Sequence, residues 1–456
     1  MNKRKLLLLT LCILSSLPVS GATFTQPELE ALLLSNNLQL KQARGEQELS
    51  LLDSKDAKTG YGPTIDLEMS GTYLANPMDS VDLILPLPAS MGGPIPMSVD
   101  TGLENSLYNF SLTLTQPVWT WGKLKNGVAM TEKLIEIRQE QRFALQKSLL
   151  AELQSRLYAQ QYLSRMGDLL DEQLHYSQVL VSLVKESFAN ALVLEEEVLA
   201  ASVSERQIEL AKVQVAQQEQ RQRSAIGRLC DITLSAGDEL VWEPDEKRLV
   251  SLLSYDLKTL QALATAKSQE QVRIATLMGE LASLSTSIAK GDLYWKPDVA
   301  IQVSLEYGGS KFPVFEDGWD ATDDYTFNVS VGMKTTIWDG GKKFHEVRRN
   351  AIGESRSHLD MGQVYQAILS QVEEAYLTLH LAQENLAYLR LKRESLDAEV
   401  AKQQLLFESG YGSEADLIKA KLAALSAEVE TEQQWLTYAG SFVTITTLCG
   451  VENPLL

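Results

Sequence analysis

Cysteine is scarce in this 456-residue sequence, and long apolar runs are absent from most of it. Cys12 lies in an apolar segment near the N-terminus, and only Cys230 and Cys449 follow it. So few cysteines exclude a disulfide scaffold. No stretch of about 18 apolar residues occurs after residue 22, which argues against a transmembrane helix in that part of the sequence.

Basic residues and histidines are also few. The sequence has 41 Lys and Arg against 60 Asp and Glu, a formal net charge of −19 with histidine neutral. It contains no basic stripe with which a nucleic-acid-binding protein would neutralise phosphates. No two of the four histidines have the i, i+4 spacing of a helical metal site, and the stretches GGSK and GGKK lack the spacing of a phosphate loop. With no nucleophile beside a base, the sequence argues against an enzyme and predicts no cofactor and no bound metal.

The first 22 residues have the pattern of a secretory signal peptide. Lys3, Arg4 and Lys5 precede the apolar run LLLLTLCIL, and the small residues SGA end at Ala22. Signal peptidases cut after small residues placed in this way. We expect residues 1–22 to be removed, which would take the formal charge from −19 to −22.

Proline is absent from residues 120–240 and again from 315–452. Both stretches are rich in good helix formers, and their apolar residues recur at helical spacing. They predict long helices over about 123–190 and 342–409, each roughly 100 Å long at 1.5 Å per residue. Shorter helical segments are predicted at about 25–58, 194–229, 254–290 and 414–448.

Two stretches of the sequence, PVWTWGKLKNGV from Pro117 and TIWDGGKKFHEV from Thr336, match at a constant offset that takes Trp119 to Trp338. The same offset relates Ser111 to Ser330, Gly122 to Gly341, Phe188 to Phe407 and Cys230 to Cys449. One ungapped register over about 120 residues indicates a tandem duplication. We therefore divide the chain into a first copy at 23–230, a linker at 231–252 and a second copy at 253–456.

Each copy also carries two segments in which apolar and polar residues alternate. They predict strands at about 64–73, 107–118, 298–307 and 325–337, each close to the ten residues of a tilted membrane-spanning strand. Acids and small polar residues occupy the second face, as in the wall of a water-filled lumen. Aromatic residues gather at one end of the strands, as an interfacial belt would place them: Tyr61, Trp119, Trp121, Tyr294, Trp295 and Trp338. The pattern favours a membrane β-barrel over an amphipathic sheet packed on a soluble core.

Four strands are too few to close a barrel, since single-chain barrels need at least about eight. Open strand edges in lipid would leave backbone groups without hydrogen bonds, so the chain is expected to assemble with copies of itself. Two copies would give eight strands around a filled lumen, and three would give twelve around a water-filled bore. The apolar stripes of the long helices need partners as well.

The duplicated helix–strand–strand–helix plan resembles the TolC family of outer-membrane efflux proteins. The segments LLLSNNLQLKQAR, WDGGKK, LFESGYGSEADLIKAKLAAL, GRLCD and TLCGV carry the resemblance, as do Pro63 and Pro297 before the first strand of each copy. The resemblance covers nearly the whole chain after the signal peptide. It implies a mixed α and β membrane protein, a homotrimer whose twelve-stranded β-barrel continues into a twelve-helix α-barrel. It also implies an exit duct in the outer membrane of a Gram-negative bacterium, extending into the periplasm. Such a duct conducts substrates passively from a periplasmic adaptor and an inner-membrane pump, in efflux or in type I secretion.

The resemblance further implies a narrow periplasmic end at the helix returns, where acids six and nine residues after the turn glycine ring the pore. Counted from Gly410 these positions are Asp416 and Lys419, so only the first is acidic, and Glu197 is the counterpart of Asp416. Alternatively, Asp416 has only a structural role, in a helix cap with Ser413. The implied adaptor-docking tips are Asn190, Ala191, Gly410, Gly412 and Ser413, and the implied membrane-interface aromatics are Trp119, Trp121, Trp295 and Trp338.

Several alternatives stay open at this point. A periplasmic coiled-coil scaffold without a pore would need no barrel, and a diffusion porin would need no helices of ~100 Å. Cys230 and Cys449 are either two packed thiols or a disulfide. The apolar loop at 74–105 either folds over the channel mouth or packs on a neighbouring copy. If the acidic balance extends to the lumen, the channel favours cations.

Overall fold

The computed structural model describes residues 22–75, 80–86, 93–100, 106–235, 237–242, 249, 252–266, 269–309 and 325–450. Apart from Ala22, the expected signal peptide lies outside these residues. The chain divides into two compact units. Unit 1 comprises Met1–Gln47, Ile137–Thr276 and Leu359–Leu456, and unit 2 comprises Glu48–Glu136 and Leu277–His358.

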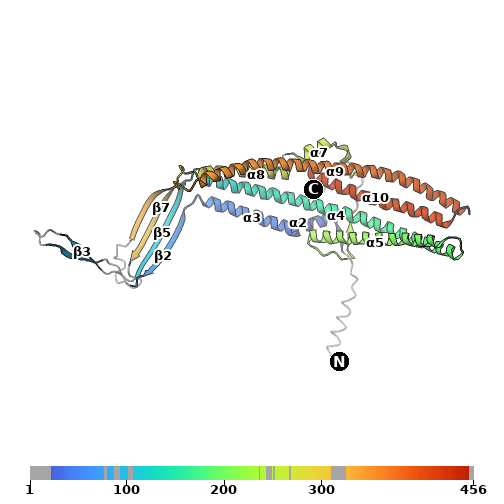
Figure 1. The fold of residues 1–456 in the computed structure, drawn as a ribbon, viewed down its shortest axis with the longest axis horizontal. Helices are drawn as coiled ribbons and strands as arrows, with labels where there is room; N and C mark the ends of the chain where they lie inside the picture. The colour runs from blue at the N-terminus through green and yellow to red at the C-terminus, as the bar shows by residue number, and fades with distance from the viewer. Residues whose placement is uncertain are drawn as a thin grey trace, which may run out of the picture. The chain divides into compact units, whose positions relative to one another are not determined.

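Long helices make up most of the chain (Figure 1). The two longest, of 67 residues each, are α4 (Lys123–Ala189) and α9 (Lys342–Glu408). Each is followed by a return helix of 36 residues, α5 (Glu195–Cys230) or α10 (Glu414–Cys449). The shorter helices are α2 (Gln26–Asn36), α3 (Leu38–Thr59), α7 (Leu257–Ala264), α8 (Glu270–Gly291) and the 3₁₀ turn η2 (Leu252–Ser254). Among the described residues no helix is both long and apolar enough to cross a membrane.

Helix boundaries repeat between the two copies. The offset that takes Trp119 to Trp338 also takes both ends of α4 to the ends of α9, and both ends of α5 to those of α10. The relation between the twin sequence stretches therefore extends to whole helices. The two helical hairpins have the same arm lengths because neither copy has gained or lost a residue between the start of the long helix and the end of the return.

In unit 1 the long and return helices pack in the order α5, α4, α10, α9. An ion pair between Lys212 and Asp171 joins α5 to α4. On the other side of α4, Lys421 of α10 lies over the ring of Tyr176, 4.9 Å from its centroid. An ion pair of 2.7 Å joins Lys392 of α9 to Glu430 of α10. Inside this row, Leu163, Met166, Leu170 and Val215 form a buried cluster on which Val429 of α10 packs.

Two larger cores lie where the return helices end. One gathers side chains of α7, α9 and α10 around the fully buried Tyr162 and Tyr438, and Cys449 belongs to it. The other packs α2 on α4 and α5 and includes Cys230. Both thiols are free and buried, which supports packed thiols over a disulfide. They donate weak hydrogen bonds to the carbonyl oxygens of Leu29 and Leu260, at 3.4 and 3.3 Å.

The leading helix of the first copy is broken where one helix was expected. Asn37, between α2 and α3, is 5% exposed, and its backbone N–H closes α2 by donating to Leu33 O at 3.0 Å. Its amide nitrogen donates to Leu229 O at 2.9 Å, and its side-chain oxygen accepts from the backbone N–H groups of Gln39 and Leu40. An Asn side chain offers both a donor and acceptors, so it can cap the start of α3 and bond the last turn of α5 at once. At the start of α2, β1 (Thr23–Thr25) pairs in parallel with β6 (Glu239–Val241).

Unit 2 contains a four-stranded antiparallel sheet in the order β2–β5–β7–β8. Its strands are β2 (Thr64–Tyr73), β5 (Ser106–Trp119), β7 (Asp298–Gly309) and β8 (Tyr325–Lys334). The sheet is open, with β2 and β8 as its edges. β8 stops three residues before the expected end at 337, and a separate hairpin, β3 (Ser80–Leu85) with β4 (Ile95–Asp100), lies in the β2–β5 connection.

Candidate channel-forming surfaces

The four-stranded sheet has one apolar and one polar face. Cross-strand neighbours share a face, and the register pairs Leu67 with Leu112, Leu112 with Leu305 and Leu305 with Phe327. One residue along, the row is Glu68, Ser111, Glu306 and Thr326. Every residue of β2 and β8 is exposed, so no core covers the apolar face within the described chain. An uncovered and predominantly apolar sheet face is what a lipid-facing surface requires.

At the helix end of the sheet, the expected belt tryptophans are exposed and close together. Trp119 and Trp121 lie edge to face with ring centroids 6.0 Å apart, and Trp295 lies 6.0 Å from Phe344. Trp338 follows β8 and is 78% exposed. The indole N–H of Trp121 donates to Pro297 O at 2.8 Å. Rings with a polar handle placed here fit an interfacial belt.

A register shift in β5 decides the side on which Trp119 lies. The register pairs Pro117 with Ala300 and Trp119 with Val299, so Val118 is an extra residue. Without this bulge, the alternation from Leu112 would put Trp119 on the polar face. The extra residue moves it to the apolar face beside Val299.

A second aromatic group occupies the opposite end of the sheet, and it was not among the expected belt residues. The rings of Tyr108 and Tyr307 lie 5.8 Å apart, those of Tyr307 and Tyr325 lie 4.5 Å apart, and Tyr73 is 72% exposed. From Tyr108 to Trp119 along β5 is roughly 36 Å, which a tilt of ~40° reduces to about 28 Å. That is close to the thickness of a bilayer hydrocarbon core. The signal was present in the sequence, since each of these tyrosines lies at the far end of an alternating run.

The joint between sheet and helices in unit 2 is held by paired charges. Lys123 Nζ, at the start of α4, lies 2.8 Å from Asp292 Oδ1 and 2.6 Å from Asp298 Oδ2. Lys343, at the start of α9, also pairs with Asp292 at 3.2 Å. Burial opposes ionisation of Asp292, yet the hydrogen bonds from the two lysines prevail and keep its pKa below the usual value. The twin sequence stretches therefore mark the two places where strand gives way to long helix.

The helix returns are tight turns closed by a residue in the left-handed region. Gly410 has φ 76°, and Tyr411 N donates to Leu406 O at 2.9 Å, as at a Schellman-type helix end. In the first copy the left-handed residue is Ala191, with φ 58°, rather than its neighbour Asn190. Gly412 has no free space for a side chain, because a Cβ there would lie 2.9 Å from Leu406 Cβ.

The candidate pore residues lie at the starts of the return helices. Ser413 caps α10: its hydroxyl accepts from Asp416 N at 3.1 Å and donates to Asp416 Oδ2 at 2.6 Å. Asp416 therefore does take part in the helix cap, which was the alternative role expected for it. Asp416, Lys419 and Glu197 are all exposed, so the cap leaves Asp416 facing solvent. A place around a pore would depend on neighbouring copies of the chain.

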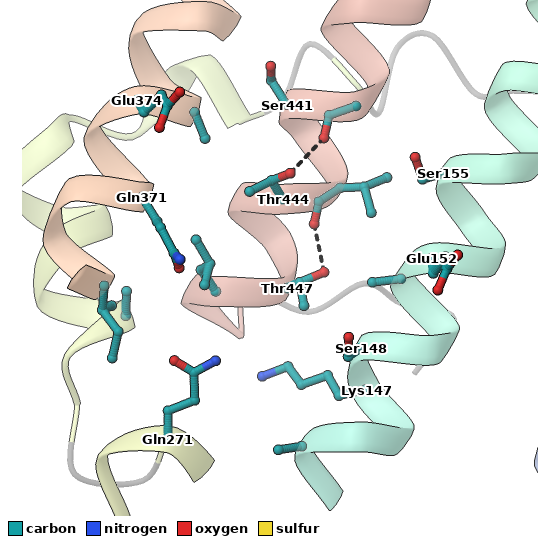
Figure 2. A pocket seen from close by; sticks show the side chains of 18 of the residues that line it. Lys147, Ser148, Glu152, Ser155, Gln271, Gln371, Glu374, Ser441, Thr444 and Thr447 are labelled. Atoms are coloured by element: carbon teal, nitrogen blue, oxygen red, sulfur yellow. Dashed lines mark hydrogen bonds between the residues drawn. The ribbon is translucent and has the colours of Figure 1, made fainter. Parts of the chain in front are cut away.

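Unit 1 also contains a cavity of about 750 Å³ between α4, α9 and α10 (Figure 2). Two of its hydroxyls are turned back on their own helix: Thr444 donates to Gly440 O and Thr447 to Val443 O, at 3.0 and 2.7 Å. Lys147 Nζ lies 3.4 Å from Glu270 Oε2. The residues that line the cavity bring no nucleophile beside a base. Its space arises from small side chains on facing helices: Ala144, Ser148, Ala151, Gly440 and Ser441.

Solved structures with this fold are outer-membrane channels and a related membrane protein. The CmeC outer membrane channel of Campylobacter jejuni aligns with a TM-score of 0.73 at 14% identity, over 93% of this chain and 85% of that one. A membrane protein from Pseudomonas aeruginosa aligns at 0.72 and 14%, over 94% and 91%. The outer membrane protein VceC of Vibrio cholerae aligns at 0.71 and 12%, over 93% and 96%. At such identities the likeness shows the shared fold alone.

Sequence comparison gives the family. No curated protein sequence matches this chain. The family profile described as outer membrane efflux protein matches residues 29–230 and 280–451, which is most of the chain and includes the long and return helices of both copies. This match and the shared fold confirm the resemblance to TolC-like channels. The chain belongs to the outer membrane efflux protein family.

Proposed function

We propose that three copies of this outer-membrane efflux protein form a closed exit duct, a twelve-stranded barrel continued by a tunnel of twelve helices. One observation carries the proposal: the sheet of unit 2 is apolar on one face, polar on the other and uncovered on both. A soluble protein would bury that apolar face. A barrel wall leaves it to lipid and turns the polar face toward water.

The open edges of the chain support assembly into a ring. The sheet ends in the unpaired edges β2 and β8, and the row of helices in unit 1 ends in α5 and α9. Edge β2 of one copy can pair with β8 of the next, and α5 can pack on α9 in the same way. Contacts of this head-to-tail kind close into rings. Closure also removes the strand edges that lipid would not tolerate.

The edge helices have exposed apolar stripes that the inner helices lack. On α5 the stripe is Leu199, Val203, Leu210 and Val213, and on α9 it is Leu377, Leu381, Tyr388 and Leu391. In both stripes the successive residues are four, seven and three positions apart, which is the spacing of coiled-coil seams. All eight side chains are more than half exposed in the single chain. A neighbouring copy would cover them.

The duct is passive, and a periplasmic adaptor with an inner-membrane pump supplies substrate and energy. The helix returns are the natural docking ends, because they present exposed side chains such as Leu192 and Tyr411, which are 76% and 88% exposed. We place Asn190, Ala191, Gly410, Gly412 and Ser413 at this surface, and Asp416 and Glu197 at the rim of the pore. Lys419, one helical turn further, would temper the negative charge of that rim.

A periplasmic scaffold without a pore is the competing function. It explains the long helices, but it leaves the apolar sheet face and the two aromatic groups without a role. The crystal structures of CusC concern transmembrane channel formation, and that of Neisseria gonorrhoeae MtrE is of the open state of an outer membrane channel. Both proteins share this fold, which favours the channel over the scaffold.

Assembly and conduction test the proposal together. Light scattering of the detergent-purified protein should give the mass of three chains, and planar bilayers should show channels. Leu210→Glu on the α5 stripe should shift the protein toward smaller species, since it places a charge in the seam. Gln218→Glu, an exposed change off that stripe, is the matched control. A stable, detergent-free monomer would contradict the channel and support the scaffold.

A further inference from the structure

The β3–β4 hairpin has one continuous apolar face. Its register pairs Val81 with Val99, Leu83 with Met97 and Leu85 with Ile95, so six apolar side chains lie on one side. Each is between 38% and 51% exposed. A two-stranded hairpin is at best marginally stable in water by itself. This face therefore needs a cover, which the described part of the chain does not supply.

We propose that the hairpins of three copies cover one another, packing their apolar faces together across the outer mouth of the channel. The inference rests on the trimeric channel proposed above. The hairpin leaves the sheet after Tyr73 and re-enters at Ser106, the end opposite to the belt tryptophans and the helices. Because the helices enter the periplasm, this end faces outward. The hairpin also leaves from β2, the edge strand that meets the neighbouring copy.

The hairpin is long enough to reach its symmetry copies. Twelve strands ~4.8 Å apart and tilted by ~40° give a barrel with a backbone radius of roughly 12 Å. A strand of six residues, such as β3, spans about 20 Å. A hairpin rooted on the rim can therefore reach the threefold axis. There, three identical apolar faces meet without any opposed charge.

Charge argues against a lipid headgroup surface as the cover. Between Tyr73 and Tyr108 the sequence has four acids, Asp79, Asp82, Asp100 and Glu104, and neither lysine nor arginine. Docking on anionic headgroups draws on cationic side chains. Of the acids in the described hairpin, Asp82 pairs with Ser98 on the face opposite the apolar one, and Asp100 pairs with Ser80 at the base. The copies can thus meet through the uncharged face while Asp82 lies on the opposite face.

Cysteine cross-linking in the assembled protein tests the contact. Met97→Cys puts a thiol at the centre of the apolar face, and Ser98→Cys puts one on the opposite face of the same strand. The two native cysteines are buried and contribute little background. A short bifunctional maleimide should join Met97→Cys protomers into covalent dimers and leave Ser98→Cys protomers mostly single.

The outcomes separate the hairpin contact from the assembly itself. An intact trimer without cross-linking at Met97→Cys, or with equal cross-linking at both positions, overturns the proposal. Quenching of a Met97→Trp variant by brominated lipids beyond that of the unchanged protein, whose belt tryptophans are also open to lipid, would show that the cover is lipid and would overturn the proposal as well. A protein that never forms trimers contradicts the channel proposal itself, and the hairpin contact falls with it.

Single-channel conductance tests the packing of the hairpins' apolar faces independently. Leu83→Asn should loosen the packed hairpins and raise single-channel conductance at least twofold, because the outer mouth opens. Ile84→Asn is the matched control, since Ile84 is the adjacent residue on the other face and is 71% exposed. Equal conductance of the Leu83→Asn variant and the unchanged protein, in channels of normal trimer mass, would overturn the proposed lid.

Discussion

Backbone positions with a left-handed φ show where the two copies have diverged. Three non-glycine residues of the described chain take this conformation: Trp121, Ala191 and Asp231. The offset between the copies takes each of them to a glycine with the same conformation, at Gly340, Gly410 and Gly450. A side chain in this region costs roughly 1–2 kcal/mol relative to the right-handed region. The first copy therefore bears strain that the second avoids.

Ala191→Gly should stabilise the first return turn by about 1 kcal/mol, since glycine adopts this φ without a steric penalty. Gly410→Ala should destabilise the second return by a similar amount and is the mirror-image control. Hydrogen exchange of Leu192 N–H, which donates to Ser187 O at 2.9 Å, measures the first effect locally. Unchanged protection of that amide in Ala191→Gly would show that the turn is not strained.

The buried thiols predict a loss of stability at alkaline pH. Burial raises the pKa of Cys230 and of Cys449 from 9.0 to about 11, although Lys147 works against the rise at Cys449. The folded state thus holds these protons more tightly than the unfolded state. Their contribution is fully present below pH ~9 and is lost as the pH rises toward 11, on the order of 1–2 kcal/mol for each thiol.

Thermal unfolding at pH 8 and at pH 10.5 measures this loss. The double variant Cys230→Ala, Cys449→Ala should lose less stability between the two pH values than the unchanged protein. Equal losses in the two proteins would assign the alkaline effect to other groups, such as Tyr438, whose pKa burial raises to about 12.

At the scale of the element, the sheet separates apolar from polar side chains along each strand, and the proposed barrel would turn the apolar ones to lipid. Leu67→Arg should impair membrane insertion by about 2–4 kcal/mol, because Leu67 lies near the middle of the apolar face. Glu68→Arg, one residue along on the polar face, should insert normally. Flotation of the protein with lipid vesicles gives the inserted fraction, and equal insertion of the two variants would contradict the assigned faces.

Elements with a strong local period could be predicted from the sequence. Alternation predicts a strand at about 64–73, and β2 spans Thr64–Tyr73. The first return lacks local turn signals in the sequence. Ala191 stands where the second copy has Gly410, and Leu194 stands at the helix cap where the second copy has Ser413. Both local turn signals are missing there, and the packing of α5 on α4 sets the turn instead.

Other features depend on contacts between distant residues and left no local trace. The break at Asn37 rests on a hydrogen bond to Leu229, which lies 192 residues away. The bulge at Val118 exists only relative to β7, and the pairing of Lys123 with Asp292 joins the two copies. The sequence does not predict the β3–β4 hairpin, because prolines and glycines interrupt its apolar run. Of the candidate site residues, the structure shows the surroundings of each, while their place around a pore stays a prediction.

For the whole molecule, the acidic row of the sheet predicts ion selectivity. Glu68 and Glu306 lie opposite Ser111 on the polar face, so three copies would place six carboxylates around the lumen. Such a ring attracts cations and repels anions. The double variant Glu68→Gln, Glu306→Gln should lower the cation-to-anion permeability ratio several-fold. Ser111→Ala, a neutral change in the same row, should leave it unchanged.

Reversal potentials across a salt gradient near ~0.1 M measure the ratio, since higher salt would screen the ring. Anion selectivity of the unchanged channel would contradict the assignment of this face to the lumen.

The identical arm lengths of the two helical hairpins limit how the protein can evolve. One added heptad in α4 alone would lengthen that arm by roughly 10 Å, and its return would no longer end level with that of α9. A partner that meets both returns at once would then lose half of its contacts. In the proposed duct, changes of tunnel length should therefore arise as matched insertions or deletions in the two halves of the gene, so that each copy constrains the length of the other.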